Sequence, residues 1–124
     1  MKIGKTSNPL SMMASISFER YTIYRADLNP TRGSEINKIR PVVVVSRNEL
    51  NGVLETVVVC PLTTKLHPKW RSRLQVLCQG KKAEVAVDQI RTLSKSRLVS
   101  KLGMLSPKDA RELRLLISEM YGEP

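Results

Sequence analysis

The chain has 124 residues, the length of one domain, which buries about two-thirds of the surface that the unfolded chain exposes. Hydrophobic residues make up 41% and aromatic residues 4%, so Val, Leu and Ile must fill the core and few large rings are left for stacking. The 21 Lys and Arg residues against 11 Asp and Glu give a net charge of +10. This charge favours either a polyanionic partner (RNA, DNA, an anionic membrane surface or an acidic protein) or a solvated basic surface.

Residues 1–20 are expected to form a flexible tail before a single domain at 21–124. Serines and Asn8-Pro9 interrupt the weakly apolar middle of this tail, and no cleavage motif follows, so no signal peptide is predicted. No stretch approaches the roughly 18 apolar residues of a membrane span. Cys60 and Cys78 lack metal-site spacing, which favours reduced thiols, with a disulfide as the alternative. We therefore expect a cytoplasmic protein that does not bind membranes.

The first predicted elements are two strands. Residues 23–28 alternate in polarity and end at the turn-forming run 29–33, after which a loop continues through Lys38. Residues 42–45 are four consecutive valines, a β-branched run that suits a strand covered on both faces.

A second valine strand is predicted at residues 54–62. Pro61 indicates that this strand lies at an edge or ends there, because proline cannot donate to a ladder. Residues 48–52 are turn formers, so the two valine strands predict a hairpin. The run TTKLHPKWRSR at residues 63–73 is basic, contains Pro68 and has no periodicity, which is typical of a loop.

Short strands and one helix complete the chain. Strands are predicted at 74–77, 84–87 and 101–105, with Gly80-Lys81-Lys82 as a solvated hairpin tip and a helical turn capped by Ser94. Ser106-Pro107 is an N-cap followed by proline at the first helical position, and the helix ends before Gly122. Its apolar face, more typical of core than of a partner surface, comprises Ala110, Leu113, Leu116, Ile117 and Met120. This order predicts a small, mostly antiparallel barrel with a C-terminal helix.

Four blocks carry a resemblance to a known family. They are YRADLNPTRGSEINKIRPVVVVS at 24–46, VVVCPLTT at 57–64, VDQIRTLSKSRL at 87–98 and KLGMLS at 101–106. In order and spacing they resemble the MazF/PemK family of toxin endoribonucleases, over about residues 21–121. The resemblance implies a mainly β fold, an SH3-like small β-barrel of the CcdB/PemK type with a C-terminal helix.

The resemblance also implies a function. Such a toxin of a type II toxin-antitoxin system is an mRNA interferase: it cleaves single-stranded RNA sequence-specifically and without metal or cofactor. Attack by the 2′-hydroxyl leaves a 2′,3′-cyclic phosphate and a 5′-hydroxyl. The implied partners are single-stranded RNA, a second copy in a homodimer, and a cognate acidic, MazE-like antitoxin, through which the complex would bind DNA.

Arg40 matches the family's catalytic arginine. A guanidinium is always ionised and offers a planar fork of donors to the negatively charged phosphorane that forms when the 2′-oxygen attacks. Pro41 stiffens the junction between the loop and the strand. The alternative is that Arg40 merely pairs with Glu35.

Thr63 matches the catalytic threonine, and its hydroxyl could donate to a phosphate oxygen from a strand end. It could instead bond only to its own backbone in a turn. Glu35 could accept a proton or orient Arg40, and the residues leave these two roles equally open.

RNA binding is expected from side chains around these three. Trp70 could stack on an unpaired base while cations follow the backbone, or it could fold onto the barrel as core. His67 is expected to be a solvated loop residue, and Arg91 could lie near the site or at the dimer seam. The expected RNA-binding residues are Ser34, Thr64, Lys65, Trp70, Arg71 and Arg91.

The sequence departs from the Kid-like branch of the family. The histidine, arginine and aspartate used there match Ser34, Ala86 and Asp88, so two of the three are missing and Asp88 is expected to be a structural acceptor for loop backbone. Two other functions stay open. A CcdB-like gyrase poison would need a C-terminal Trp-Gly-Ile, which this chain lacks, and a non-catalytic RNA-binding module would bind RNA without cutting it.

Overall fold

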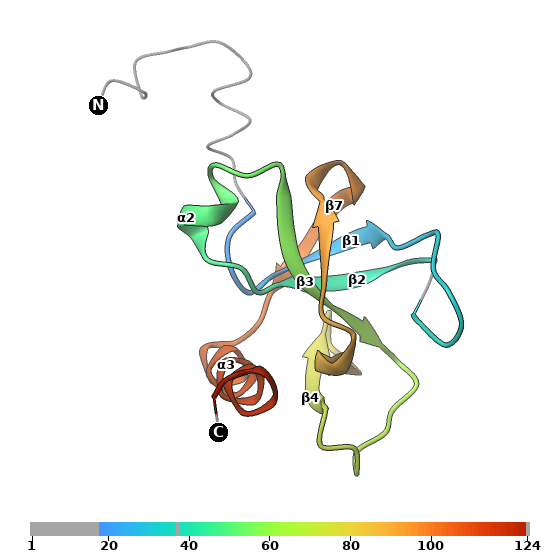
Figure 1. The fold of residues 1–124 in the computed structure, drawn as a ribbon. Coiled ribbons are helices and arrows are strands. Elements are labelled where there is room, and N and C mark those ends of the chain that lie inside the picture. The colour runs from blue at the N-terminus through green and yellow to red at the C-terminus, as the bar shows by residue number, and fades with distance from the viewer. Residues whose placement is uncertain (1–17, 37, 124) are drawn as a thin grey trace.

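The computed structural model describes residues 18–36 and 38–123. The chain forms a curled antiparallel sheet, a half-barrel, with one longer helix packed against it (Figure 1). The mainly β prediction with a C-terminal helix is confirmed, and of the predicted tail only residues 18–20 are described. The strands are β1 (Thr22–Asp27), β2 (Ile39–Val44), β3 (Thr56–Thr63), β4 (Arg73–Cys78), β5 (Lys81–Ala86), β6 (Arg91–Ser94) and β7 (Leu98–Met104). The helical elements are α2 (Asn48–Asn51), the 3-10 turns η2 (Val87–Gln89) and η3 (Lys95–Arg97), and α3 (Pro107–Tyr121).

The central strand is β3. It pairs with β2 along one side, and along the other with β6 from Thr56 to Val59 and with β5 at Leu62 and Thr63. Pro61 falls between the β6 and β5 pairings, so its missing N–H removes no bond from either ladder. The prediction of an edge strand was wrong, because β3 has partners on both sides.

The valine strands pair as predicted, β2 against β3. Val43 and Val45 enter the core beneath α3, whereas Val42 and Val44 enter a second core on the opposite face of the sheet. Both faces of β2 are therefore covered, as the unbroken valine run predicts. The connection between β2 and β3 differs from the predicted turn, because it contains α2. Asn51 of this helix is fully buried, and its side-chain amide donates to the backbone carbonyls of Phe18 and Ser46.

The β4–β5 hairpin has a two-residue turn. Gln79 and Gly80 have φ of 52° and 77°, the left-handed backbone of a type I′ turn. Lys81 and Lys82 are therefore the first residues of β5, and their predicted position at the hairpin tip was wrong.

Helix α3 covers one end of the half-barrel. The Ser106 hydroxyl accepts the Asp109 N–H at 3.1 Å, Pro107 occupies the first turn, and the helix ends before Gly122, as predicted. The apolar stripe is core: Ala110 and Leu113 are buried and the rest of the stripe packs against them. No helix among the described residues has the length and apolarity needed to cross a membrane.

Candidate functional site

The β2–β3 register brings Arg40 and Thr63 together. Val42 lies opposite Pro61 in this antiparallel pair, and continuing the register by two residues places Arg40 across from Thr63. Opposite residues share a face of the sheet, with Cβ atoms about 5 Å apart. Both line one cleft of about 140 Å³, here called the Arg40/Thr63 cleft.

The Arg40/Thr63 cleft is cationic. Lys81 and Lys82 line it from β5, opposite Arg40, and Thr64 adds a second hydroxyl beside Thr63. Among the described residues that line it, none is acidic. Clustered cations and hydroxyl donors of this kind are suited to a phosphate group. Neither lysine was predicted to be a site residue, although a turn at Gln79-Gly80 would have placed both at the start of a strand.

The Thr63 hydroxyl is held in place by the loop that follows it. Its oxygen accepts the backbone N–H of Lys65 at 3.1 Å, the turn-type bond that the sequence left as an alternative. This bond uses the oxygen as an acceptor and leaves the hydroxyl hydrogen as a donor. The local bond and a donor role toward a ligand are therefore compatible.

The two cysteines are free and buried, as predicted for reduced thiols. Cys78 lines the Arg40/Thr63 cleft, and burial raises the pKa of its thiol. Burial, reinforced by the charge of Asp88, raises the pKa of Cys60 to about 12. Both thiols therefore stay protonated near neutral pH, and neither is a nucleophile there.

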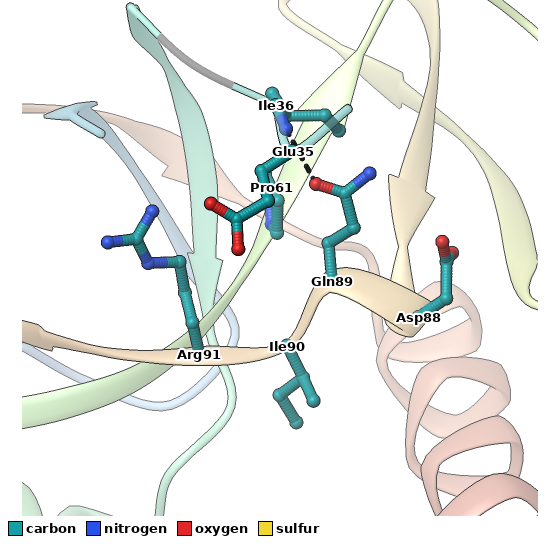
Figure 2. A pocket seen from close by; sticks show the side chains of 7 residues that line it. All are labelled: Glu35, Ile36, Pro61, Asp88, Gln89, Ile90 and Arg91. Atoms are coloured by element: carbon teal, nitrogen blue, oxygen red, sulfur yellow. Dashed lines mark hydrogen bonds between the residues drawn. The ribbon is translucent and has the colours of Figure 1, made fainter. Parts of the chain in front are cut away.

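Glu35 lines a second pocket of about 300 Å³, here called the Glu35/Arg91 pocket. Figure 2 shows the Glu35 carboxylate between the side chains of Arg91 and Gln89. Two hydrogen bonds order the loop that carries Glu35. Within the loop, Glu35 accepts the Arg32 N–H at 2.7 Å, and Gln89 of η2 accepts the Ile36 N–H at 2.7 Å. Along β3, Pro61 lines this pocket and Leu62 lines the Arg40/Thr63 cleft, so the three residues expected to be catalytic are distributed over two neighbouring hollows.

The residues expected to bind RNA lie around both hollows. Thr64 lines the Arg40/Thr63 cleft, Arg91 lines the Glu35/Arg91 pocket, and Ser34 is exposed next to Glu35. The remaining three, Lys65, Trp70 and Arg71, are exposed on the β3–β4 loop, residues 64–72. Trp70 is 49% exposed, so it is not a core residue.

A buried ionic network lies beneath the β3–β4 loop. Glu84 is fully buried and accepts hydrogen bonds from Arg73 Nη1 at 2.6 Å and from the His67 backbone N–H at 2.6 Å. Arg73 Nε donates to Asp88 at 2.8 Å. The prediction that His67 is a solvated loop residue was wrong: its side chain is only 25% exposed, its Nδ1 lies 3.3 Å from Glu84 Oε2, and its ring stacks on Trp70. Asp88 is an acceptor, as expected, although its main partner is a side chain.

The network shifts the pKa values of its members. Burial raises the pKa of Glu84, but the hydrogen bonds from His67, Gln75 and Arg73 outweigh it and hold the pKa below its usual value. Burial also raises the pKa of Asp88, but the hydrogen bond from Arg73 contributes to a net pKa below the usual value. The Arg73 pKa is raised: the two carboxylates overcome its burial.

We predict that these carboxylates make the fold sensitive to acid. A carboxyl whose pKa is lower in the folded state contributes stability that is complete above its unfolded pKa and is lost as pH falls through the folded pKa. The Tm should therefore decline as pH drops below about 4. Thermal unfolding followed by circular dichroism between pH 3 and pH 7 measures this, with ~0.5-unit pH steps. Glu84→Gln should show a shallower decline, and an equal decline in the variant would contradict the assignment.

Comparison with known proteins agrees with this fold. Residues 19–121 match the model of the family described as "PemK-like, MazF-like toxin of type II toxin-antitoxin system". The protein named endoribonuclease MazF from Staphylococcus saprophyticus is 33% identical over 111 residues, which cover 83% of this chain and 90% of that protein.

Solved structures have the same fold. An endoribonuclease from a mycobacterial species, solved in complex with its cognate antitoxin, superposes with a TM-score of 0.72 at 25% identity, covering 86% of this chain and 96% of that one. MazF from Deinococcus radiodurans superposes with a TM-score of 0.73 at 22% identity, covering 85% and 96%. The family model spans most of the domain and the staphylococcal relative is aligned over nearly its full length, so this chain belongs to the PemK-like, MazF-like toxins of type II toxin-antitoxin systems.

Proposed function

We propose that this protein is an endoribonuclease that cleaves single-stranded RNA in the Arg40/Thr63 cleft, sequence-specifically and without a metal ion. The observation that carries the proposal is the presence of Arg40 and Thr63 in one hollow lined by three cations and no acid among the described residues. The staphylococcal relative named endoribonuclease MazF supports the reaction class. Among residues 18–36 and 38–123, no group of three or more His, Cys, Asp or Glu side chains could hold a metal ion.

The reaction is an in-line attack of a ribose 2′-oxygen on the adjacent phosphorus. The phosphorus–oxygen bond to the 5′-oxygen of the next nucleotide breaks, and this oxygen takes up a proton from water. The products are a 2′,3′-cyclic phosphate and a 5′-hydroxyl. Arg40 stabilises the charge that develops on the phosphorane oxygens, and the Thr63 hydroxyl donates to one of them. Lys81 and Lys82 hold the phosphates on either side of the broken bond.

Glu35 accepts the proton of the 2′-hydroxyl. One of its oxygens accepts the Arg32 N–H, and its carboxylate faces the pocket that contains Arg91 and Gln89, where a ribose can approach (Figure 2). Glu35 lines a different hollow from Arg40, so its alternative role of orienting that arginine has less support. A positioned carboxylate within reach of the hydroxyl contributes about 10²- to 10⁴-fold to such a step.

The RNA path connects the exposed polar residues. It passes Ser34 and Arg91 at one pocket, crosses Thr64 in the cleft, and continues over the β3–β4 loop. On that loop Lys65 and Arg71 follow the phosphates and Trp70 stacks on a base. Arg71 also forms an ion pair with Glu119 at 3.0 Å, but both partners are exposed, so it can exchange this contact for a phosphate.

The protein acts in the cytoplasm as a homodimer and is inhibited by a cognate acidic antitoxin. The net charge of +10 favours a negatively charged inhibitor that competes with RNA, and the structure of the mycobacterial relative is that of a complex with its cognate antitoxin. In the complex of this toxin with its antitoxin, the antitoxin provides the contacts to DNA. The free thiols of Cys60 and Cys78 suit a reducing compartment.

The testing experiment incubates the purified full chain with a long single-stranded RNA in excess chelator and maps the fragment ends. We expect cuts at one short sequence, with 2′,3′-cyclic phosphate and 5′-hydroxyl ends. Thr63→Ala should lower the rate by about 10²-fold, the loss typical of one transition-state donor, whereas Thr63→Ser keeps the hydroxyl and most of the activity. RNA that stays intact, although bound, would instead indicate a non-catalytic binding module, and a strict Mg²⁺ requirement would contradict the mechanism.

A further inference from the structure

A buried ion pair between β4 and β5 lies at the base of the β3–β4 loop, and its carboxylate also binds that loop. The Arg73 side chain is 5% exposed and Glu84 is fully buried, with their nearest charged atoms 2.6 Å apart. Glu84 also accepts Gln75 Nε2 at 2.8 Å and, from the loop itself, the His67 backbone N–H at 2.6 Å. Breaking such a pair leaves a charge without its partner in a dry site, so the loop is held firmly at this point.

Trp70 rests on this network. Its ring stacks on the His67 ring at 3.8 Å with the planes 19° apart, and the Arg73 guanidinium carbon lies 4.7 Å from its ring centroid. Arg73 Nη1 and His67 Nδ1 are 3.3 Å apart, and groups on opposite faces of an indole could not approach each other so closely. Both therefore contact one side of Trp70. The residue as a whole is 49% exposed, and because one side of the ring is packed, this exposure leaves the other side accessible.

The same network adjoins the proposed cleavage residues. In the β3–β5 ladder Glu84 is opposite Thr63, and in the β4–β5 ladder it is opposite Gln75. Thr63, Glu84 and Gln75 thus form one row across β3, β5 and β4. Continuing the β2–β3 register extends this row to Arg40. The carboxylate that holds the loop is therefore the cross-strand neighbour of Thr63.

We propose that Glu84 and Arg73 are positioning residues that hold Trp70 as a preformed platform for one unpaired nucleobase of the RNA, beside the cleaved bond. This inference rests on the proposed RNA substrate. A rigid indole with one face packed and the other open binds a base without first ordering the loop. Lys65 and Lys69, exposed on the same loop, supply charge for the phosphates that flank this base. A nucleobase is a better ligand for this ring than an acidic peptide, because a base has a flat face that can stack on the indole and an acidic side chain does not.

The tryptophan content of the chain allows a direct test. Trp70 is the single tryptophan, so fluorescence excited at wavelengths that the three tyrosines do not absorb reports on this loop alone. The probe is a 2′-O-methyl RNA oligonucleotide, which lacks the attacking hydroxyl and is not cleaved, and poly-L-glutamate serves as a polyanion without bases. We expect the RNA to quench Trp70 fluorescence and poly-L-glutamate to leave it unchanged.

Variants separate positioning from folding. Glu84→Gln should raise acrylamide quenching of Trp70 in the free protein and weaken the Kd for the RNA about 5- to 100-fold, the loss expected for one stacked base. In cleavage, KM should rise by a similar factor while kcat changes little. If Glu84→Gln does not fold, the double variant Arg73→Gln/Glu84→Gln replaces it, because it leaves no buried Arg73 charge. Trp70→Phe should retain most of the affinity and Trp70→Ala should lose it.

The matched control is Glu49→Gln. Glu49 pairs with Arg47, but both are exposed, and α2 lies away from the β3–β4 loop (Figure 1). Glu49→Gln should have the same Kd for the RNA and the same acrylamide quenching of Trp70 as the original chain. Equal Kd and equal acrylamide quenching in Glu84→Gln would overturn the proposal, as would RNA binding without a change in Trp70 fluorescence or quenching by poly-L-glutamate alone. RNA that binds and quenches but is never cut would refute the nuclease and leave the platform supported.

Discussion

Arg40→Ala is expected to reduce the rate of RNA cleavage about 10²- to 10³-fold, or roughly 3–4 kcal/mol of transition-state stabilisation. Arg40 lines the cleft beside Thr63, and its guanidinium meets more negative charge in the phosphorane than in the ground-state phosphate. Binding of the uncleavable 2′-O-methyl RNA should therefore fall by less than about tenfold, since Lys81 and Lys82 still contact phosphates. Single-turnover cleavage rates and Kd values measure the two quantities separately.

Two further variants sharpen this result. Arg40→Lys keeps the charge but lacks the planar fork, so its rate should lie between those of Arg40→Ala and the original chain. Arg47→Ala removes an equal charge from an exposed pair next to α2 and should leave the rate unchanged. Equal losses of binding and of rate in Arg40→Ala would assign Arg40 to ground-state binding alone.

Leu113→Ala should lower the free energy of unfolding by about 2–5 kcal/mol. Leu113 is fully buried and anchors α3 in the core that also contains Val43 and Val85. Truncation removes buried methyl groups and leaves a cavity, so the Tm should fall by on the order of 10–25 °C for a domain of this size. Chemical denaturation followed by circular dichroism measures the change.

The same helix provides the control. Leu115 lies two residues further along α3 but is 60% exposed, so Leu115→Ala should change the free energy of unfolding by less than about 0.5 kcal/mol. Similar losses in the two variants would mean that the buried face of α3 has been assigned wrongly.

Local patterns in the sequence predicted several elements well. Four consecutive valines predicted a strand buried on both faces, and Val42 to Val44 have no exposed surface. Ser106-Pro107 predicted where α3 begins, because a cap and a proline act within one turn of the chain. Such signals depend on neighbouring residues, which the sequence displays directly.

Signals that depend on distant partners were harder to interpret. Pro61 suggested an edge strand because a lone strand pattern does not reveal that its partner changes from β6 to β5 at that point. His67 looked like a solvated loop residue because the carboxylate that binds it, Glu84, is 17 residues away in the chain. Lys81 and Lys82 were predicted to lie at a hairpin tip, but the two turn residues are Gln79 and Gly80, which come earlier in the chain.

The sequence by itself determined the family resemblance, the strands and helix, and the residue types that a phosphate-binding cleft requires, because these follow from composition, periodicity and motif order. The tertiary structure alone decided which of these residues meet. Register across β3, β5 and β4 aligns Thr63, Glu84 and Gln75 in one row, and Arg40 lines the same cleft as Thr63. The loop between β1 and β2 carries Glu35 into the neighbouring pocket, where Gln89 binds the backbone of Ile36. Register and loop docking arise from hydrogen bonds and packing between segments far apart in the chain, so no local pattern encodes them.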